Sequence, residues 1–112
     1  MLPEARAYLH DIEQAAILID QFRGNKSFDD YLSDVLLRSA VERQLEIIGE
    51  AVSKLSAIDP TTAARLTGRR RIIALRNILI HGYARVDDRV IWNILDQNLP
   101  VLHAEVGVLL AG

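Results

Sequence analysis

Apolar residues recur at intervals of three and four along nearly the whole chain, which is the spacing of one face of an α-helix. From Val41 to Leu55 the intervals are four, three, four and three, so we predict a helix over about residues 33–56. A helix this long and regular should form the centre of the core. An earlier helix is expected to begin near Pro3 and to end at Arg23, before Gly24.

Capping residues mark where further elements begin. Ser27 precedes Asp30 by three positions, the arrangement of a capping box at the start of a short helix. Ser33 is a candidate cap for the long helix. The segment 58–61, Ile-Asp-Pro-Thr, is predicted to be a turn that leads into a short helical segment.

The C-terminal half continues the same helical pattern. A helix should follow Gly68 and stop at Gly82, and Asp87 is the expected cap of the last element. Pro100 should kink or divide that element near residues 97–99. No segment has the pattern of a strand. The sequence therefore predicts an all-α, up-and-down bundle of four main helices with short extra helical segments.

Composition limits the classes of protein that this chain can represent. Its 112 residues form one domain, residues 1–112, and the absence of cysteine excludes disulfides and thiolate metal sites. The three histidines are far apart, so we expect no metal and no cofactor. No segment approaches the roughly 20 apolar residues that span a bilayer, so we expect a cytoplasmic protein with no membrane partner.

Charge is distributed unevenly along the chain. Residues 65–89 carry seven arginines and two aspartates, a net charge of +5, whereas residues 1–64 and 90–112 sum to −5 and −2. A local positive surface of this kind could bind a polyanion although the whole chain is at −2. The alternative is a solvated helix face that pairs with acidic helices. The arginines nearest the motif described next are Arg69, Arg70, Arg71 and Arg85.

A guanidinium, an imidazole and a phenol interrupt the apolar stretch at residues 76–83, which reads Arg-Asn-Ile-Leu-Ile-His-Gly-Tyr. By helical rotation Arg76 falls inside the apolar stripe, where its charge needs a carboxylate, a subunit interface or a ligand phosphate. Asn77 and His81 are four apart and face the same way. His81 also ends the predicted helix, where the dipole favours imidazolium. We interpret the segment as a phosphate-handling active site.

Each of these residues also has a purely structural interpretation. Arg76 could pair with a carboxylate of the acidic row Glu42, Glu46 and Glu50, and His81 could cap a helix. Tyr83 could be an amphipathic packing residue. One such coincidence would be unremarkable, but all of them within eight residues of a basic segment favour function.

The motif resembles that of the HEPN superfamily of small helical proteins, in which an arginine, a polar residue, variable positions and a histidine follow one another. The tyrosine at position 83 makes it similar to the HepT branch. Residues 40–51 are similar to that branch's second-helix signature, as are Val90-Ile91-Trp92 and Asn98-Leu99-Pro100. The chain departs from the family pattern in residues 61–71, where positions 67–71 read Thr-Gly-Arg-Arg-Arg.

The resemblance implies a homodimer that cleaves RNA without a metal, acting as the toxin of a toxin–antitoxin pair. Arg76 would hold the phosphate, His81 would transfer protons, and Asn77 and Tyr83 would orient the substrate. RNA would also contact the four arginines around the motif. The antitoxin implied is a minimal nucleotidyltransferase of the MntA type, which would attach AMP to Tyr83. The alternative is a noncatalytic HEPN module that dimerises and binds a nucleotidyltransferase.

Overall fold

Helices make up all the regular structure in residues 1–81 and 86–112, the part of the chain that the computed structural model describes. The elements in order are α1 (Pro3–Arg23), α2 (Phe28–Ser33), α3 (Val35–Ile58), α4 (Pro60–Ala63), α5 (Arg69–His81), α6 (Asp88–Asn93), the π-helix η1 (Ile94–Asn98) and α7 (Leu99–Ala111). The predicted all-α bundle is confirmed: α1, α3, α5 and α7 are its four main helices, and the rest are short segments.

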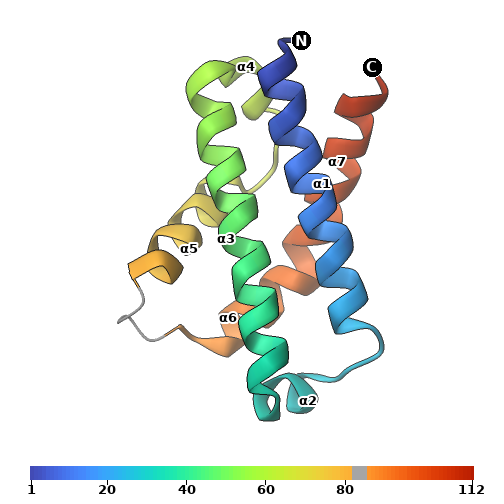
Figure 1. Ribbon diagram of the computed structural model, residues 1–112, viewed down its shortest axis with the longest axis vertical. Helices are drawn as coiled ribbons and strands as arrows, with labels where there is room; N and C mark the ends of the chain where they lie inside the picture. The colour runs from blue at the N-terminus through green and yellow to red at the C-terminus, as the bar shows by residue number, and fades with distance from the viewer. Residues whose placement is uncertain (82–85) are drawn as a thin grey trace.

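The central helix of the bundle is α3, which packs against α1 on one side and against α5 on the other (Figure 1). On its other flank α1 packs against α7, and the two chain termini lie at the same end of the bundle. The helix that carries the motif is therefore held mainly by α3.

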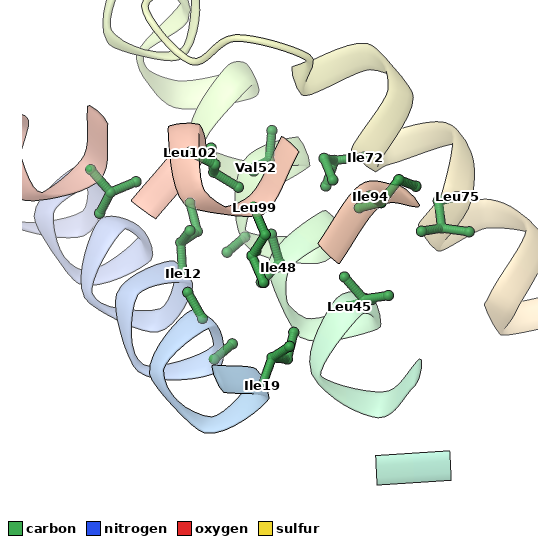
Figure 2. Close-up of a cluster of buried hydrophobic side chains, with 14 of the residues drawn as sticks. Ile12, Ile19, Leu45, Ile48, Val52, Ile72, Leu75, Ile94, Leu99 and Leu102 are labelled. Carbon is green, nitrogen blue, oxygen red and sulfur yellow. The ribbon is translucent and has the colours of Figure 1, made fainter. Parts of the chain in front are cut away.

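The core is a continuous set of aliphatic side chains from α1, α3, α5, η1 and α7, including Ile12, Ile48, Leu75, Ile94 and Leu102 (Figure 2). The positions that define the periodic stripe of the central helix are all buried. They are Val41, Leu45, Ile48, Val52 and Leu55. The spacing argument thus identified the face of α3 that meets both of its neighbours.

The capping residues match the sequence pattern with one exception. Ser27 and Asp30 form the expected capping box, each side chain accepting from the other's backbone N–H at 3.1 and 2.9 Å. The prediction for Ser33 was wrong: it is the last residue of α2, and its hydroxyl donates to backbone carbonyl oxygens of that helix. Asp34 caps α3, accepting from the N–H of Leu37 at 3.0 Å.

The start of α5 is fixed to the C-terminal helices. Gly68 has φ +73°, a left-handed conformation that glycine adopts without strain. The backbone N–H and hydroxyl of Thr67 donate to the carboxylate of Glu105 on α7, at 2.9 and 2.7 Å. Arg71 donates to Asn98 Oδ1 at 3.4 Å. These contacts set the point from which α5 crosses α3.

The C-terminal part of the bundle is divided as Pro100 predicted. Asp87 caps α6 by accepting from the N–H of Arg89 at 2.9 Å. Regular α-helix then gives way to the π-helix η1, and α7 begins at Leu99. Proline cannot donate a backbone hydrogen bond to the preceding turn, so the helix widens before it.

Candidate functional site

The motif helix crosses α3 at unusually close range where Arg76 lies over Gly49. A methyl group added at Gly49 would overlap the Cβ of Arg76 and would lie 2.8 Å from its Cγ and 3.2 Å from the carbonyl oxygen of Ile72. Only a residue without a side chain permits this crossing. Gly49 therefore leaves room for the backbone of the motif helix to approach α3.

The guanidinium of Arg76 is held from two sides. Its Nη2 donates to Glu50 Oε2 of α3, and its Nη1 donates to Asn77 Oδ1 at 2.8 Å. The Nε atom is buried without a hydrogen-bond partner in the part of the chain that the structure describes. Because the side chain is 26% exposed, one end of the guanidinium remains near solvent.

The contact with Glu50 is the ion pair that the structural interpretation of Arg76 anticipated. The carboxylate in this ion pair belongs to the glutamate of the acidic row that follows Gly49 directly. Glu50 also pairs with Lys54 Nζ at 3.4 Å. Partial burial by itself would raise the pKa of the Glu50 carboxyl, but the hydrogen bonds and charges of Lys54 and Arg76 outweigh this and lower it overall.

A cleft of about 370 Å³ opens beside this ion pair, between α1, α3 and α5. Its lining is formed by Tyr8, Asp11, Arg43, Glu46, Ile47, Glu50, Ala51, Lys54, Arg76 and Ile80. Three acidic and three basic side chains line it, so the cleft has no strong net charge. It offers both hydrogen-bond donors and hydrogen-bond acceptors next to Arg76.

The other polar residues of the motif lie on the outer side of α5. Asn77 and His81 are exposed, and His81 is the last residue of the helix. His81 is five positions after Arg76, so their Cα positions are about 140° apart around the helix axis. The hydrogen bond from Arg76 to Asn77 connects the two sides.

The remaining predicted site residues differ in their exposure to solvent, and two of them are not described. Arg70 and Arg71 are exposed on the first turn of α5, whereas Arg69 is partly buried. Tyr83 and Arg85, together with the expected helix stop at Gly82, lie outside the described residues.

Sequence reasoning missed two contacts that organise the site. The choice of Glu50 within the acidic row depends on the crossing point of α3 and α5, although its four-residue spacing to Lys54 was a usable signal. The bond from Thr67 to Glu105 joins residues that are 38 apart, and no local pattern indicated it.

Within residues 1–81 and 86–112, no group of three or more His, Cys, Asp or Glu side chains is arranged to hold a metal ion. None of the helices in these ranges is both long and apolar enough to cross a membrane.

The fold and the motif define a class of small helical proteins, and comparison with known proteins gives the family. A family model described as "Ribonuclease HepT-like" matches residues 12–109. A protein of Thermococcus cleftensis named "Probable ribonuclease HepT" is 39% identical over 98 residues, which are 85% of this chain and 86% of that protein. "Putative RNase MJ1380" of Methanocaldococcus jannaschii is 31% identical over 95% of this chain and 96% of its own length.

The chain belongs to the HepT-like ribonuclease family. This confirms the resemblance drawn from the motif at residues 76–83, and it makes the chain a ribonuclease by homology. No solved structure matches it.

Proposed function

We propose that this protein is a metal-independent endoribonuclease toxin that cleaves RNA by attack of the ribose 2′-OH on the adjacent phosphate. The observation that carries the proposal is the fixed position of the Arg76 guanidinium, bonded to Asn77 one helical turn before His81 in a HepT-like chain. This arrangement supplies a phosphate-binding cation and a titratable imidazole on one short helix.

The reaction needs few groups from the protein. A base removes the proton of the 2′-OH, the oxygen forms a bond to phosphorus, and the 5′-oxygen leaves with a proton from an acid. The products are a 2′,3′-cyclic phosphate and a 5′-hydroxyl. We assign proton transfer to His81 and stabilisation of the phosphorane charge to Arg76. Asn77 and Tyr83 orient the substrate.

A homodimer would supply two imidazoles at one phosphate, so that one copy of His81 serves as base and the other as acid. The apolar surface near the motif supports an interface at this end of α5: Ile78 and Ile80 are 44% and 48% exposed. A second chain packed there would place its own motif opposite this one, across a cleft that an RNA strand can enter.

Regulation by a minimal nucleotidyltransferase antitoxin is the second part of the proposal. Transfer of AMP to the phenol oxygen of Tyr83 would place a phosphate beside the basic segment and so compete with RNA for its positive charge. The support is the family motif, in which the tyrosine follows the histidine by two residues.

One observation favours a different function. Arg76 is neutralised by Glu50 within the same chain, as a purely structural arginine would be. In that case the protein would be a noncatalytic module that dimerises and binds a nucleotidyltransferase.

Cleavage of RNA by the purified protein in EDTA distinguishes the two functions. We expect the wild-type protein to leave 2′,3′-cyclic phosphate ends and His81→Ala to lose at least a hundredfold in rate while its helical circular dichroism is unchanged. His10→Ala is the matched control, because His10 is an exposed histidine on α1. Equal rates for His81→Ala and the wild type would remove His81 from the mechanism.

Intact mass tests the regulation separately. Protein produced together with the candidate nucleotidyltransferase should gain AMP, and Tyr83→Phe should abolish the gain while Tyr8→Phe retains it. Cleavage without any such gain would leave the nuclease standing and refute the antitoxin.

A further inference from the structure

The three arginines at the start of α5 point in different directions, although they are adjacent in sequence. Seven residues make almost two full turns, so Arg69 lies within about 20° of Arg76, and Arg70 lies within about 20° of Asn77. Arg69 is accordingly partly buried on the side that faces α3. Arg71 is directed toward η1, where it bonds to Asn98. Only Arg70 shares the outer face of the motif, so of the three arginines expected here to contact RNA we retain Arg70 alone.

The outer face of α5 forms one exposed stripe. Residues 70, 74, 77 and 81 follow one another at intervals of four, three and four, and all four are exposed. The residue between Arg70 and Asn77 on this stripe is Ala74, whose small side chain leaves the surface open. A single nucleic-acid strand lying along the helix could therefore contact both ends of the stripe.

The arginine cluster is unfavourable for the helix that carries it. Its three cations occupy the first turn of α5, which has no acidic residue, and the N-terminal end of a helix dipole is positive. The sequence thus retains repulsive charge in a chain whose other segments are acidic. An anionic ligand would relieve this repulsion.

We propose that Arg70 binds a phosphate of the RNA strand other than the scissile one, so that the strand runs along the outer face of α5 from the first turn to His81. The inference rests on the proposed ribonuclease function. The rise of a helix puts Arg70 about 16 Å from His81 along the axis. That length corresponds to about five nucleotides of a stacked strand at roughly 3.4 Å each, and to fewer of an extended one.

Substrate length tests the assignment. A ribodinucleoside monophosphate contains only the scissile phosphate, whereas a decanucleotide also reaches the first turn of α5. We expect Arg70→Gln to lower kcat/KM on the decanucleotide roughly tenfold, the effect of one charged hydrogen bond, and to leave the dinucleotide unchanged. Arg71→Gln is the matched control and should change neither. Equal losses for both variants, or an unchanged decanucleotide rate in Arg70→Gln, would overturn the proposal.

Binding separates a failure of this inference from a failure of the ribonuclease function. A single-stranded decanucleotide with 2′-O-methyl groups cannot be cleaved, so its affinity is measurable whether or not the protein is a nuclease. Arg70→Gln should reduce the slope of log affinity against log salt by about 0.7, the value for one phosphate contact on a single strand. If the wild type cuts neither RNA but this slope changes only in Arg70→Gln, the nuclease proposal fails and the phosphate contact survives. An unchanged slope refutes the contact.

Discussion

The inner and outer faces of α5 are built on different principles. On the inner face, Ile72 and Leu75 are buried against α3, and Arg76 is fixed by the close crossing over Gly49 and by Glu50. On the outer face, Arg70 and His81 are exposed. One helix of 13 residues therefore carries a packed surface and a solvated one.

The difference separates what holds the motif from what would touch a substrate. A change on the inner face must move α5 relative to α3, so it should affect folding and activity together. A change on the outer face leaves the packing intact, so it should affect activity alone. Arg76 belongs to both faces, since it bonds inward to Glu50 and outward to Asn77.

The largest expected effect comes from filling the crossing point. Gly49→Ala should destabilise the protein by about 1–3 kcal/mol, because the added methyl overlaps Arg76 and the helices must separate. Chemical denaturation followed by circular dichroism measures this, and cleavage of RNA should fall with it.

Gly107 on α7 provides the control for this substitution. No atom lies within 4 Å of a methyl group placed there. Gly107→Ala should therefore stabilise the protein by about 0.5–1 kcal/mol through its better helix propensity. The same substitution, glycine to alanine, would then change the free energy of unfolding in opposite directions at two helical glycines. Equal effects at both positions would show that the crossing of α3 and α5 is not tight.

Local patterns predicted the helices but not the contacts between them. The spacing of Val41 to Leu55 depends on a single helix, and so does the capping box at Ser27. The partner of Arg76 depends on where two helices cross, which the spacing of neither one contains. The sequence therefore indicated that Arg76 needs a carboxylate, a subunit interface or a ligand phosphate, and only the fold selected Glu50.

Similarly, Ser33 was predicted to cap α3, but the adjacent residue Asp34 caps it. Ser33 satisfies its hydroxyl within α2, and the carboxylate of Asp34 takes the cap of α3. A difference of one residue in the start of a helix is below what a capping pattern resolves. Of the site, the motif itself could be read from sequence, whereas the division of α5 into two faces required its neighbours.

A smaller effect is expected from removing the inner carboxylate. The pKa of Glu50 is lower in the folded protein than its ordinary value of 4.5, so the ionised group stabilises the fold fully above that pH. That contribution is lost as the pH falls through the lower, folded pKa. Glu50→Gln should destabilise the protein at neutral pH by about 0.5 kcal/mol, as for a partly exposed ion pair. Chemical denaturation at several pH values from 7 to 3 measures this, and the free energies of unfolding of the wild type and Glu50→Gln should converge as the pH falls.

Glu42, two turns earlier on α3, supplies a contrast of opposite sign. Burial, followed by the nearby charge of Asp88, raises the pKa of Glu42, and the charge of Arg38 opposes this. Its ionisation in the folded state therefore becomes unfavourable as the pH rises from the unfolded pKa to the folded one. Glu42→Gln should stabilise the protein at neutral pH and lose this advantage in acid. If the free energy of unfolding changed with pH in the same way in Glu42→Gln and Glu50→Gln, the two carboxyl groups would not lie in different environments.

The smallest effect on stability belongs to the outer face, where function and stability should diverge. Arg70→Gln removes a cation from the positive end of α5, so it should stabilise the fold by about 0.3 kcal/mol at low salt, and added salt should screen the gain. Arg71→Gln should gain less, because it relieves the same repulsion from the helix dipole but also removes the hydrogen bond to Asn98 Oδ1. RNA cleavage should nevertheless fall only in Arg70→Gln, since only Arg70 shares the face of His81. Thermal unfolding at two salt concentrations, measured beside the cleavage rates, makes the comparison. A loss of stability in Arg70→Gln would mean that Arg70 holds the fold and that the outer face is not reserved for a ligand.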